Sequence, residues 1–321
     1  MNQLIQNESL SKDAIAQAWQ LIMQAQKITL LTHKDPDGDC VSACAALDHL
    51  LTKLGKSVET IYPNKAEFDF KRQPKNIIIN AHNQTPDLII ACDISVYARL
   101  YFHPLFATIP LINIDHHVCN AINGTVNLVS QNSSSTCEDL FLIIHAWDEK
   151  LVDRYVAECL LAGLLSDSQI FQTNAVTPRT LHIAALLMER GADLFTVKAE
   201  LTENRDVNII AFWGQLLGNI TITPDKKAAW IAISQEDLRQ QKLTLTSLVG
   251  FSNFLSQLSG IDITMVFYEN EKGETQASIR SKQTDVNALA RHFGGGGHVN
   301  AAGITSDKPL KQLVAQVLEK I

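Results

Sequence analysis

The sequence predicts an α/β protein whose larger, N-terminal domain is a mostly parallel sheet flanked by helices. Two observations predict it. Short apolar runs alternate with helical patterns as far as about residue 190, and a second, smaller α+β pattern begins near residue 221. The 321 residues are enough to bury a core in each of two domains. We therefore expect one domain over residues 1–190, a helical connector over 191–220 and a second domain over 221–321.

Five strand-like runs are expected in the first domain. The first covers residues 27–32 and leads into a helical pattern over 40–55, which Gly55 closes. The others cover residues 57–62, 76–80, 87–92 and 110–114. Ligands of open parallel sheets bind outside the carboxyl ends of the strands, so the residues that follow these runs are candidates for a site.

From Thr136 onward the pattern of the chain is helical. One helix is predicted over residues 155–165 and another over 177–191, with Thr177 as its N-cap and Pro178 as its first helical residue. A further helical pattern covers residues 205–220. In the second domain, three strands and one helix between the first two are predicted, over residues 226–234, 245–260 (the helix), 261–269 and 274–281.

Composition and charge narrow the class of protein. The net charge of −7 argues against a protein that binds long nucleic acid by neutralising its backbone. The net charge does not exclude small anionic substrates, because bound metal ions can supply local positive charge. No apolar run approaches the roughly 20 residues that span a membrane, and the N-terminus lacks the apolar core of a signal peptide. We expect a cytoplasmic protein without a membrane partner.

The six cysteines all lie in the first half of the sequence, and none forms a CxxC pair. We expect them to be buried small hydrophobic residues in a reducing compartment rather than disulfides. Cys40 and Cys44 are four residues apart on a predicted helix, which leaves a metal-binding role open for them.

Metal-type ligands follow three of the strand-like runs and end one helix. They are His33, Asp37 and Asp39, then Asp93, then Asp115, His116 and His117, and finally Asp167. Taken singly, these residues have simpler explanations, since Asp, Pro and Gly form solvated turns and a single Asp often caps a helix. Their joint occurrence favours a pair of divalent ions such as Mn²⁺, with Mg²⁺, Co²⁺ or Fe²⁺ as alternatives. Two such ions suit the hydrolysis of a phosphate ester.

The motifs around these residues resemble those of the DHH phosphoesterases. "THKDPDGDCVSACAAL", "ACDISVYARL", "IDHHVCN" and "GLLSDSQIF" are similar to the four motifs of that family, and "SSSTCEDL" to its Ser/Thr-rich segment. "SIRSKQTDVNALARHFGGGGHVNAAG" resembles the DHH-associated domain. The resemblance covers essentially the whole chain, in the family's order. Ser42, Ala43, Ser166, Ser168 and Gln169 depart from the usual pattern, the last where glycine is common, and none of these departures removes a ligand.

The resemblance implies a role for each candidate residue. One ion would be bound by His33, Asp37 and Asp93, and the other by Asp39, Asp93, His116 and Asp167, so that Asp93 bridges the two and a metal-activated hydroxide attacks phosphorus. Asp115 would orient a neighbouring group, and His117 would lie near the substrate phosphate. The implied substrate-binding residues of the second domain are Arg280, Ser281, Gly295, Gly296, Gly297 and His298.

The length and architecture are similar to the family's type that degrades short oligoribonucleotides to mononucleotides and converts pAp to AMP and phosphate. Short RNA or small nucleotides are therefore the expected substrates, and a homodimer is compatible with the family. Hydrolysis of cyclic di-AMP or pApA is the alternative within the family. A non-catalytic nucleotide-binding module is a further alternative, although such a module should have lost metal ligands.

Overall fold

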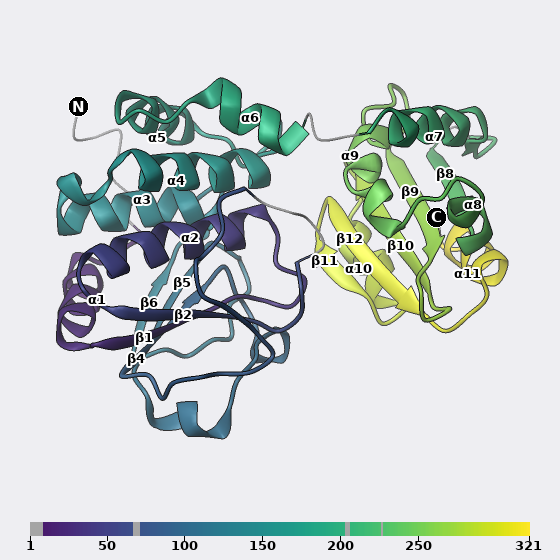
Figure 1. Ribbon diagram of the computed structural model, residues 1–321. Coiled ribbons are helices and arrows are strands. Elements are labelled where there is room, and N and C mark those ends of the chain that lie inside the picture. Colours follow the sequence, from purple (N-terminus) through teal and green to yellow (C-terminus); the bar gives the residue numbers. More distant parts are fainter. Residues whose placement is uncertain (1–8, 67–70, 203–205, 226) are drawn as a thin grey trace. The chain divides into compact units, whose positions relative to one another are not determined.

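The computed structural model describes residues 9–66, 71–202, 206–225 and 227–321 (Figure 1). The chain forms two compact units, Met1–Asn204 and Arg205–Ile321. The segment that we expected to connect them is divided between the two. Helix α6 (Leu194–Thr202) buries Val197 in the core of the first unit, whereas α7 (Val207–Gly218) buries Trp213 in a core of the second.

The first unit is built on a six-stranded parallel sheet with the strand order β3-β2-β1-β4-β5-β6. The strands are β1 (Lys27–Leu31), β2 (Ser57–Tyr62), β3 (Ile77–Ile79), β4 (Leu88–Cys92), β5 (Leu111–Asp115) and β6 (Val126–Val129). The first five confirm the strand-like runs of the sequence. The edge strand β6 was missed, because its four residues are too few to show an alternating pattern.

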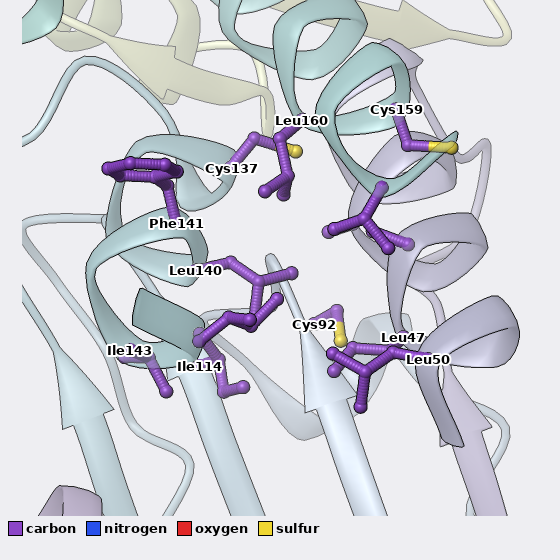
Figure 2. Close-up of a cluster of buried hydrophobic side chains, with 14 of the residues drawn as sticks. Leu47, Leu50, Cys92, Ile114, Cys137, Leu140, Phe141, Ile143, Cys159 and Leu160 are labelled. Carbon is purple, nitrogen blue, oxygen red and sulfur yellow. The ribbon is translucent and has the colours of Figure 1, made fainter. Parts of the chain in front are cut away.

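Five more helices accompany this sheet. They are α1 (Lys12–Gln24), α2 (Gly38–Lys53), α3 (Thr136–Trp147), α4 (Arg154–Asp167) and α5 (Pro178–Glu189). Figure 2 shows Leu50 of α2, Leu140 of α3 and Leu160 of α4 gathered in one core with Cys92 and Ile114 of the strands. The opposite face of the sheet is covered by a smaller apolar cluster around Phe106. No helix in the described ranges is both long and apolar enough to cross a membrane.

All six cysteines are free thiols. Five are buried among apolar side chains, as expected, and Cys137 and Cys159 can be seen there in Figure 2. Cys119 is exposed, and the expectation of a buried residue was wrong for it. It lies in the loop that follows the histidine pair after β5, where no core is available to cover it.

The strand order fixes where a ligand of the first unit can lie. The order reverses between β1 and β4, which are hydrogen-bonded neighbours, and β5 lies next to β4. In open parallel sheets of this order, the helical connections leave on opposite sides of the reversal, and a crevice opens at the carboxyl ends of the strands there. The residues that follow β1, β4 and β5 therefore meet at one edge of the sheet.

The second unit has a six-stranded mixed sheet with the strand order β11-β12-β10-β9-β8-β7. Its elements are β7 (Thr221–Ile222), β8 (Ala228–Ile233), α8 (Gln235–Gln240), η4 (Leu245–Leu248), α9 (Phe251–Leu255), β9 (Ile263–Glu269), β10 (Thr275–Ser281), α10 (Val286–Arg291), β11 (Gly296–His298), β12 (Ala301–Ser306) and α11 (Leu310–Leu318). The three predicted strands are present. The single helix predicted over 245–260 was wrong, because Gly250 adopts φ +82° and separates η4 from α9.

Candidate metal centre

The turn after β1 brings three of the candidate ligands to the edge of the sheet. Asp37 is the N-cap of α2, and its Oδ1 accepts hydrogen bonds from the amides of Asp39 and Cys40, each at 3.1 Å. The carboxylate of Asp39, in the first turn of the helix, is fully buried. His33 precedes this turn and is also buried. The Pro-Asp-Gly-Asp sequence therefore starts a helix with acidic side chains at its N-terminus, where the helix dipole stabilises them.

Asp93 follows β4 directly and has an unusual backbone conformation. Its φ is +62°, in the left-handed region that residues with a side chain rarely adopt. The buried backbone is held by a hydrogen bond from its amide to the Ile114 carbonyl at 2.9 Å. Its carboxylate accepts a hydrogen bond from the Thr136 hydroxyl at 2.9 Å. This turn aims a buried carboxylate at the candidate site.

The three residues after Ile114 have different surroundings. Asp115 is fully buried, and its Oδ1 accepts hydrogen bonds from the His116 amide at 2.9 Å and from His117 Nδ1 at 2.6 Å. Its Oδ2 accepts a hydrogen bond from the Asn120 amide group at 2.5 Å. Both oxygens of Asp115 are thus engaged in shaping the turn that carries the two histidines.

The imidazole rings of His33 and His116 are oriented by backbone carbonyls. His33 Nδ1 lies 2.7 Å from the Lys34 carbonyl oxygen, and His116 Nδ1 lies 3.4 Å from that of Ser133. Arg99 Nη2 lies 2.8 Å from His33 Nδ1 and 3.2 Å from the Lys34 oxygen. We assign the proton to Nδ1 of His33, because the shorter contact is to a carbonyl acceptor, and Arg99 then donates to the same carbonyl. This tautomer leaves Nε2 available as a ligand atom, as in histidines that bind metals.

The Nε2 atoms of both rings face carboxylates. His33 Nε2 lies 3.7 Å from an oxygen of Asp37 and 3.7 Å from one of Asp93. His116 Nε2 lies 3.1 Å from Asp167 Oδ2 and 3.5 Å from Asp93 Oδ1. Asp93 is thus the residue that both imidazoles share.

Three groups of side chains are compact enough to bind an ion, each with its ligand atoms within 4.8 Å of one another. They are His33, Cys40 and Asp93; Asp93, His116 and His117; and Asp39, His116 and Asp167. Cys40 Sγ donates to the Cys92 carbonyl at 3.3 Å, which gives this thiol a structural role without a metal. The candidates predicted after three separate strands therefore come together in space.

Burial and mutual repulsion shift the pKa values of the carboxylates. Burial, together with the charges of Asp93 and Asp167, raises the pKa of Asp39 well above its usual value. Burial also raises the pKa of Asp167. For Asp93 burial acts in the same direction, but the neighbouring His33 and the charge of His116 outweigh it and lower its pKa. Buried carboxylates that repel one another are relieved by cations.

The donor set fits divalent cations of the Mn²⁺ type. Carboxylate oxygens and imidazole nitrogens are the hard and borderline ligands that such ions prefer, and they are supplied by Asp37, Asp39, Asp93, Asp167, His33 and His116. Backbone hydrogen bonds orient three of these side chains: Nδ1 of His33 and of His116 donates to a carbonyl, and Asp37 Oδ1 accepts from an amide, which is the support that metal ligands require.

The N-terminus of α3 contributes contacts to which the sequence analysis assigned no role. The amides of Thr136 and Cys137 donate to the two oxygens of Asp39 at 2.6 and 3.1 Å. Glycine at position 163 lets α4 approach, because a Cβ there would lie 2.6 Å from Asp39 Oδ1. The Ser/Thr-rich sequence before Glu138 was the available signal, since such residues start helices.

The second unit has a hollow of about 380 Å³ on its sheet, beside Arg280. Arg280, Gly296 and Gly297 line it, and so do Tyr268, Gln276, Ser278, Gly303 and Thr305, which the sequence analysis did not select. Strand alternation could have found two of them, because residues 276, 278 and 280 share one face of β10. Arg280 Nε donates to Asn253 Oδ1 at 2.9 Å.

The other candidate residues of the second unit are Ser281, Gly295 and His298. The Ser281 hydroxyl donates to the Thr284 carbonyl at 2.5 Å, and Ser281 is absent from the residues that line the hollow. Gly295 packs against β12, where a Cβ would lie 2.1 Å from the Gly303 carbonyl oxygen. The side chain of His298 lies outside the described residues.

Comparisons with known proteins agree with this geometry. The model of the DHH family, N-terminal domain, matches residues 27–164, and the model of the DHHA1 domain matches residues 238–321. The chain thus carries a DHH domain followed by a DHHA1 domain. These domains and the relatives below support a phosphoesterase, and DHH phosphoesterases depend on metal ions.

Curated relatives resemble this chain over most of its length. The bifunctional oligoribonuclease and PAP phosphatase NrnA of Mycoplasma genitalium is 26% identical, over 97% of this chain and 99% of the relative. The protein of the same name from Bacillus subtilis is 25% identical, over 86% and 88%. The crystal structure of an exopolyphosphatase-related protein from Bacteroides fragilis covers 98% of both chains with a TM-score of 0.91. At 23% identity, this last likeness shows the shared fold.

Proposed function

We propose that this protein hydrolyses short oligoribonucleotides to mononucleotides and pAp to AMP plus phosphate. The observation that carries the proposal is the convergence of His33, Asp39, Asp93, His116 and Asp167 at one edge of the parallel sheet. The NrnA-type relatives, which match 97% and 86% of this chain, support the choice of substrates. The net charge of −7 favours short substrates over long nucleic acid.

We propose two divalent ions, with Mn²⁺ as the best fit to the donors. His33, Asp37 and Asp93 would hold one ion, and Asp39, Asp93, His116 and Asp167 the other. When bound, the ions would supply a hydroxide nucleophile and neutralise charge on the phosphoryl group. The hydrogen bonds of Thr136 to Asp39 and Asp93 would fix both carboxylates in direction, and bound cations would favour the ionised form of Asp39 against its burial.

His117 and Asp115 would act next to the reacting phosphate. The 2.6 Å contact with Asp115 makes Nδ1 of His117 the donor of that bond and turns Nε2 away from Asp115. We propose that Nε2 contacts a phosphoryl oxygen of the substrate. Asp115 would act through this ring and through the backbone of the turn, without touching substrate.

In the second unit, we propose that Arg280, Gly296, Gly297 and His298 contact a phosphate of the nucleotide. A guanidinium group offers two parallel donors to a phosphate, and glycines let the backbone approach an anion closely. Ser281 would support this surface through its hydrogen bond to the Thr284 carbonyl, and Gly295 through its close packing on β12. We place the activity in the cytosol, which agrees with six free thiols.

The test is a comparison of kcat/KM over pAp, RNA of two to five nucleotides, pApA, cyclic di-AMP and a 24-nucleotide RNA. We expect mononucleotide or phosphate release from pAp and short RNA with Mn²⁺, loss of that release with EDTA, and recovery when Mn²⁺ is returned. A higher kcat/KM for pApA or cyclic di-AMP than for pAp and short RNA would show that the proposed substrates are wrong. The absence of turnover on every short nucleotide would favour a binding module instead.

A further inference from the structure

The segment Ser133–Thr136, between β6 and α3, contacts three of the proposed metal ligands. The Thr136 amide donates to Asp39, and its hydroxyl donates to Asp93. The Ser133 carbonyl accepts a hydrogen bond from His116 Nδ1. The position of this short segment therefore sets the direction of ligand atoms that come from three separate strand ends.

The opposite side of the segment is held by Glu138. This carboxylate is fully buried in the first turn of α3. The amide and hydroxyl of Ser134 donate to its Oε2 at 3.0 and 2.6 Å, and the Thr180 hydroxyl donates to the same oxygen at 2.9 Å. Its Oε1 accepts a hydrogen bond from Arg179 Nε at 2.7 Å. The buried charge is thus fully compensated.

Arg179 also reaches past Glu138 to the segment itself. Its Nη2 donates to the Asn132 carbonyl at 2.8 Å and to the Ser133 hydroxyl at 3.0 Å. Ser133 in turn donates to the buried carboxylate of Asp139 at 2.5 Å. One guanidinium from the first turn of α5 therefore joins the residues on both ends of the segment. No contact of Arg179 itself with a proposed metal ligand occurs among the described residues.

We propose that Arg179 is a positioning residue of the metal centre. Together with Glu138, it holds the Ser133–Thr136 segment in the place from which Ser133 orients His116 and Thr136 orients Asp39 and Asp93. The inference rests on the proposed metal site and adds to it a residue outside the motifs that carry the ligands. A change that lets the segment move alters the ligand geometry and lowers metal affinity, as loss of outer hydrogen-bond partners does at other metal sites.

A purely structural role for Arg179 makes a different prediction. In that case its loss lowers the stability of the first unit and leaves metal affinity unchanged. Arg72 is a matched control, because its side chain is 12% exposed compared with 15% for Arg179. Arg179 bonds the carboxylate of Glu138, and Arg72 bonds those of Glu158 and Glu200, neither of which belongs to the segment or the site.

The experiment measures Mn²⁺ binding to the full chain by calorimetry, together with thermal unfolding without metal. We expect Arg179→Met to bind Mn²⁺ about 10- to 100-fold more weakly. We expect Arg72→Met to stay within about twofold of the unmodified protein even where it unfolds at a lower temperature. Arg179→Lys should have an intermediate affinity, because an ammonium can reach Glu138 but lacks the planar fork that also bonds Asn132.

The outcomes separate this inference from the proposed function. Unchanged Mn²⁺ affinity in a folded Arg179→Met would overturn the positioning role. If that variant does not fold, Ser134→Ala decides, since it removes one bond to Glu138 and touches no proposed ligand. It should also weaken Mn²⁺ binding, and unchanged affinity contradicts the inference. If the unmodified protein binds no Mn²⁺, the proposed metal site falls as well, whereas lack of turnover with normal binding affects the proposed function alone.

Discussion

Asp93 combines a left-handed backbone conformation with a buried carboxylate. Its left-handed backbone costs free energy that a glycine would avoid, and its carboxylate is buried among other acids. Such strain persists only where the surroundings hold it, and here the Ile114 carbonyl and the Thr136 hydroxyl do so. Strain of this kind clusters at functional sites, which makes Asp93 the first residue of the site to test.

Asp93→Ala should abolish hydrolysis, because the proposed assignment gives both ions a ligand from this carboxylate. Asp87→Ala is the control, since Asp87 lies just before the same strand and accepts bonds from the amides of Gln26 and Lys27. It should keep near-normal kcat. Phosphate release at saturating Mn²⁺ checks both variants, and near-normal turnover of Asp93→Ala would show that the bridging assignment is wrong.

Gly163→Ala tests how tightly α4 packs against the site. Alanine normally stabilises a helix by up to about 1 kcal/mol relative to glycine. Here a Cβ would lie 2.2 Å from Cys137 Sγ and 2.6 Å from Asp39 Oδ1, so we expect destabilisation of about 1–3 kcal/mol and weaker Mn²⁺ binding.

The control for this substitution is Gly214→Ala in α7. A Cβ at position 214 has no neighbour within 4 Å, so this variant should be neutral or more stable by up to about 1 kcal/mol. Urea denaturation measures both changes. Equal stabilisation by the two substitutions would mean that α4 can move away from Asp39 without cost.

At the scale of elements, the ends of three helices meet at the candidate centre. Helices α2 and α3 begin there, and their first amides bond Asp37 and Asp39. Helix α4 ends there with Asp167, at the end of a helix where a carboxylate is unfavourable. The two N-termini stabilise negative charge, while Asp167 adds a charge that needs a cation or His116 nearby. The three helix ends thus gather negative charge at one place, which favours the binding of positively charged ions.

The start of α4 gives a pH-dependent prediction. Asp153 is its N-cap, and burial raises its pKa, but the hydrogen bonds of Lys53, Val156 and His49 outweigh burial and hold the pKa below its usual value. A lowered folded-state pKa adds stability above the unfolded value of about 3.9, and this stability is lost as the pH falls through the folded-state pKa.

Asp153→Asn should therefore be less stable than the unmodified protein at pH 7, while it keeps a good N-cap side chain. The difference in free energy of unfolding should shrink as the pH falls below about 4. Urea denaturation at pH 7 and at pH 3 measures it. A difference that stays constant over this range would mean that the charge of Asp153 contributes nothing.

At the scale of the whole molecule, the two units carry different kinds of groups. The first gathers carboxylates and imidazoles at the ends of its parallel strands. The second presents an arginine and glycines on a mixed sheet. Each unit has its own apolar core, so a change on the second sheet should leave the metal ligands undisturbed.

Arg280→Ala should raise KM or lower kcat/KM for pAp and leave Mn²⁺ content unchanged. The guanidinium is proposed to contact a substrate phosphate, and the side chains of Asn253 and Ser278 accept hydrogen bonds from it. Steady-state kinetics and metal analysis of the same preparation check the prediction. Loss of bound metal in this variant would contradict a separate phosphate-binding role.

Much of the fold followed from local patterns, and the exceptions have local causes. The buried parallel strands were predicted because they are continuous apolar runs bounded by turns. Strand β6 was missed because four residues show too little alternation. The break between η4 and α9 was missed because a single glycine, Gly250, does not interrupt the helical pattern of the sequence. Gln169, which departs from the family's usual glycine, has φ +48°. The conformation that glycine favours is kept there although the residue has a side chain.

The sequence by itself determined the fold class, the family resemblance and the set of acids and histidines that follow the strands. The reason is that strand periodicity and ligand type are properties of neighbouring residues. Only the tertiary structure decided that both oxygens of Asp115 accept hydrogen bonds from its own turn, and that Thr136 and Arg179 support the site. The contacts of Thr136 and Arg179 join residues far apart in the chain, and the packing of α3 and α5 in the first unit creates them, whereas those of Asp115 depend on the exact path of its own turn.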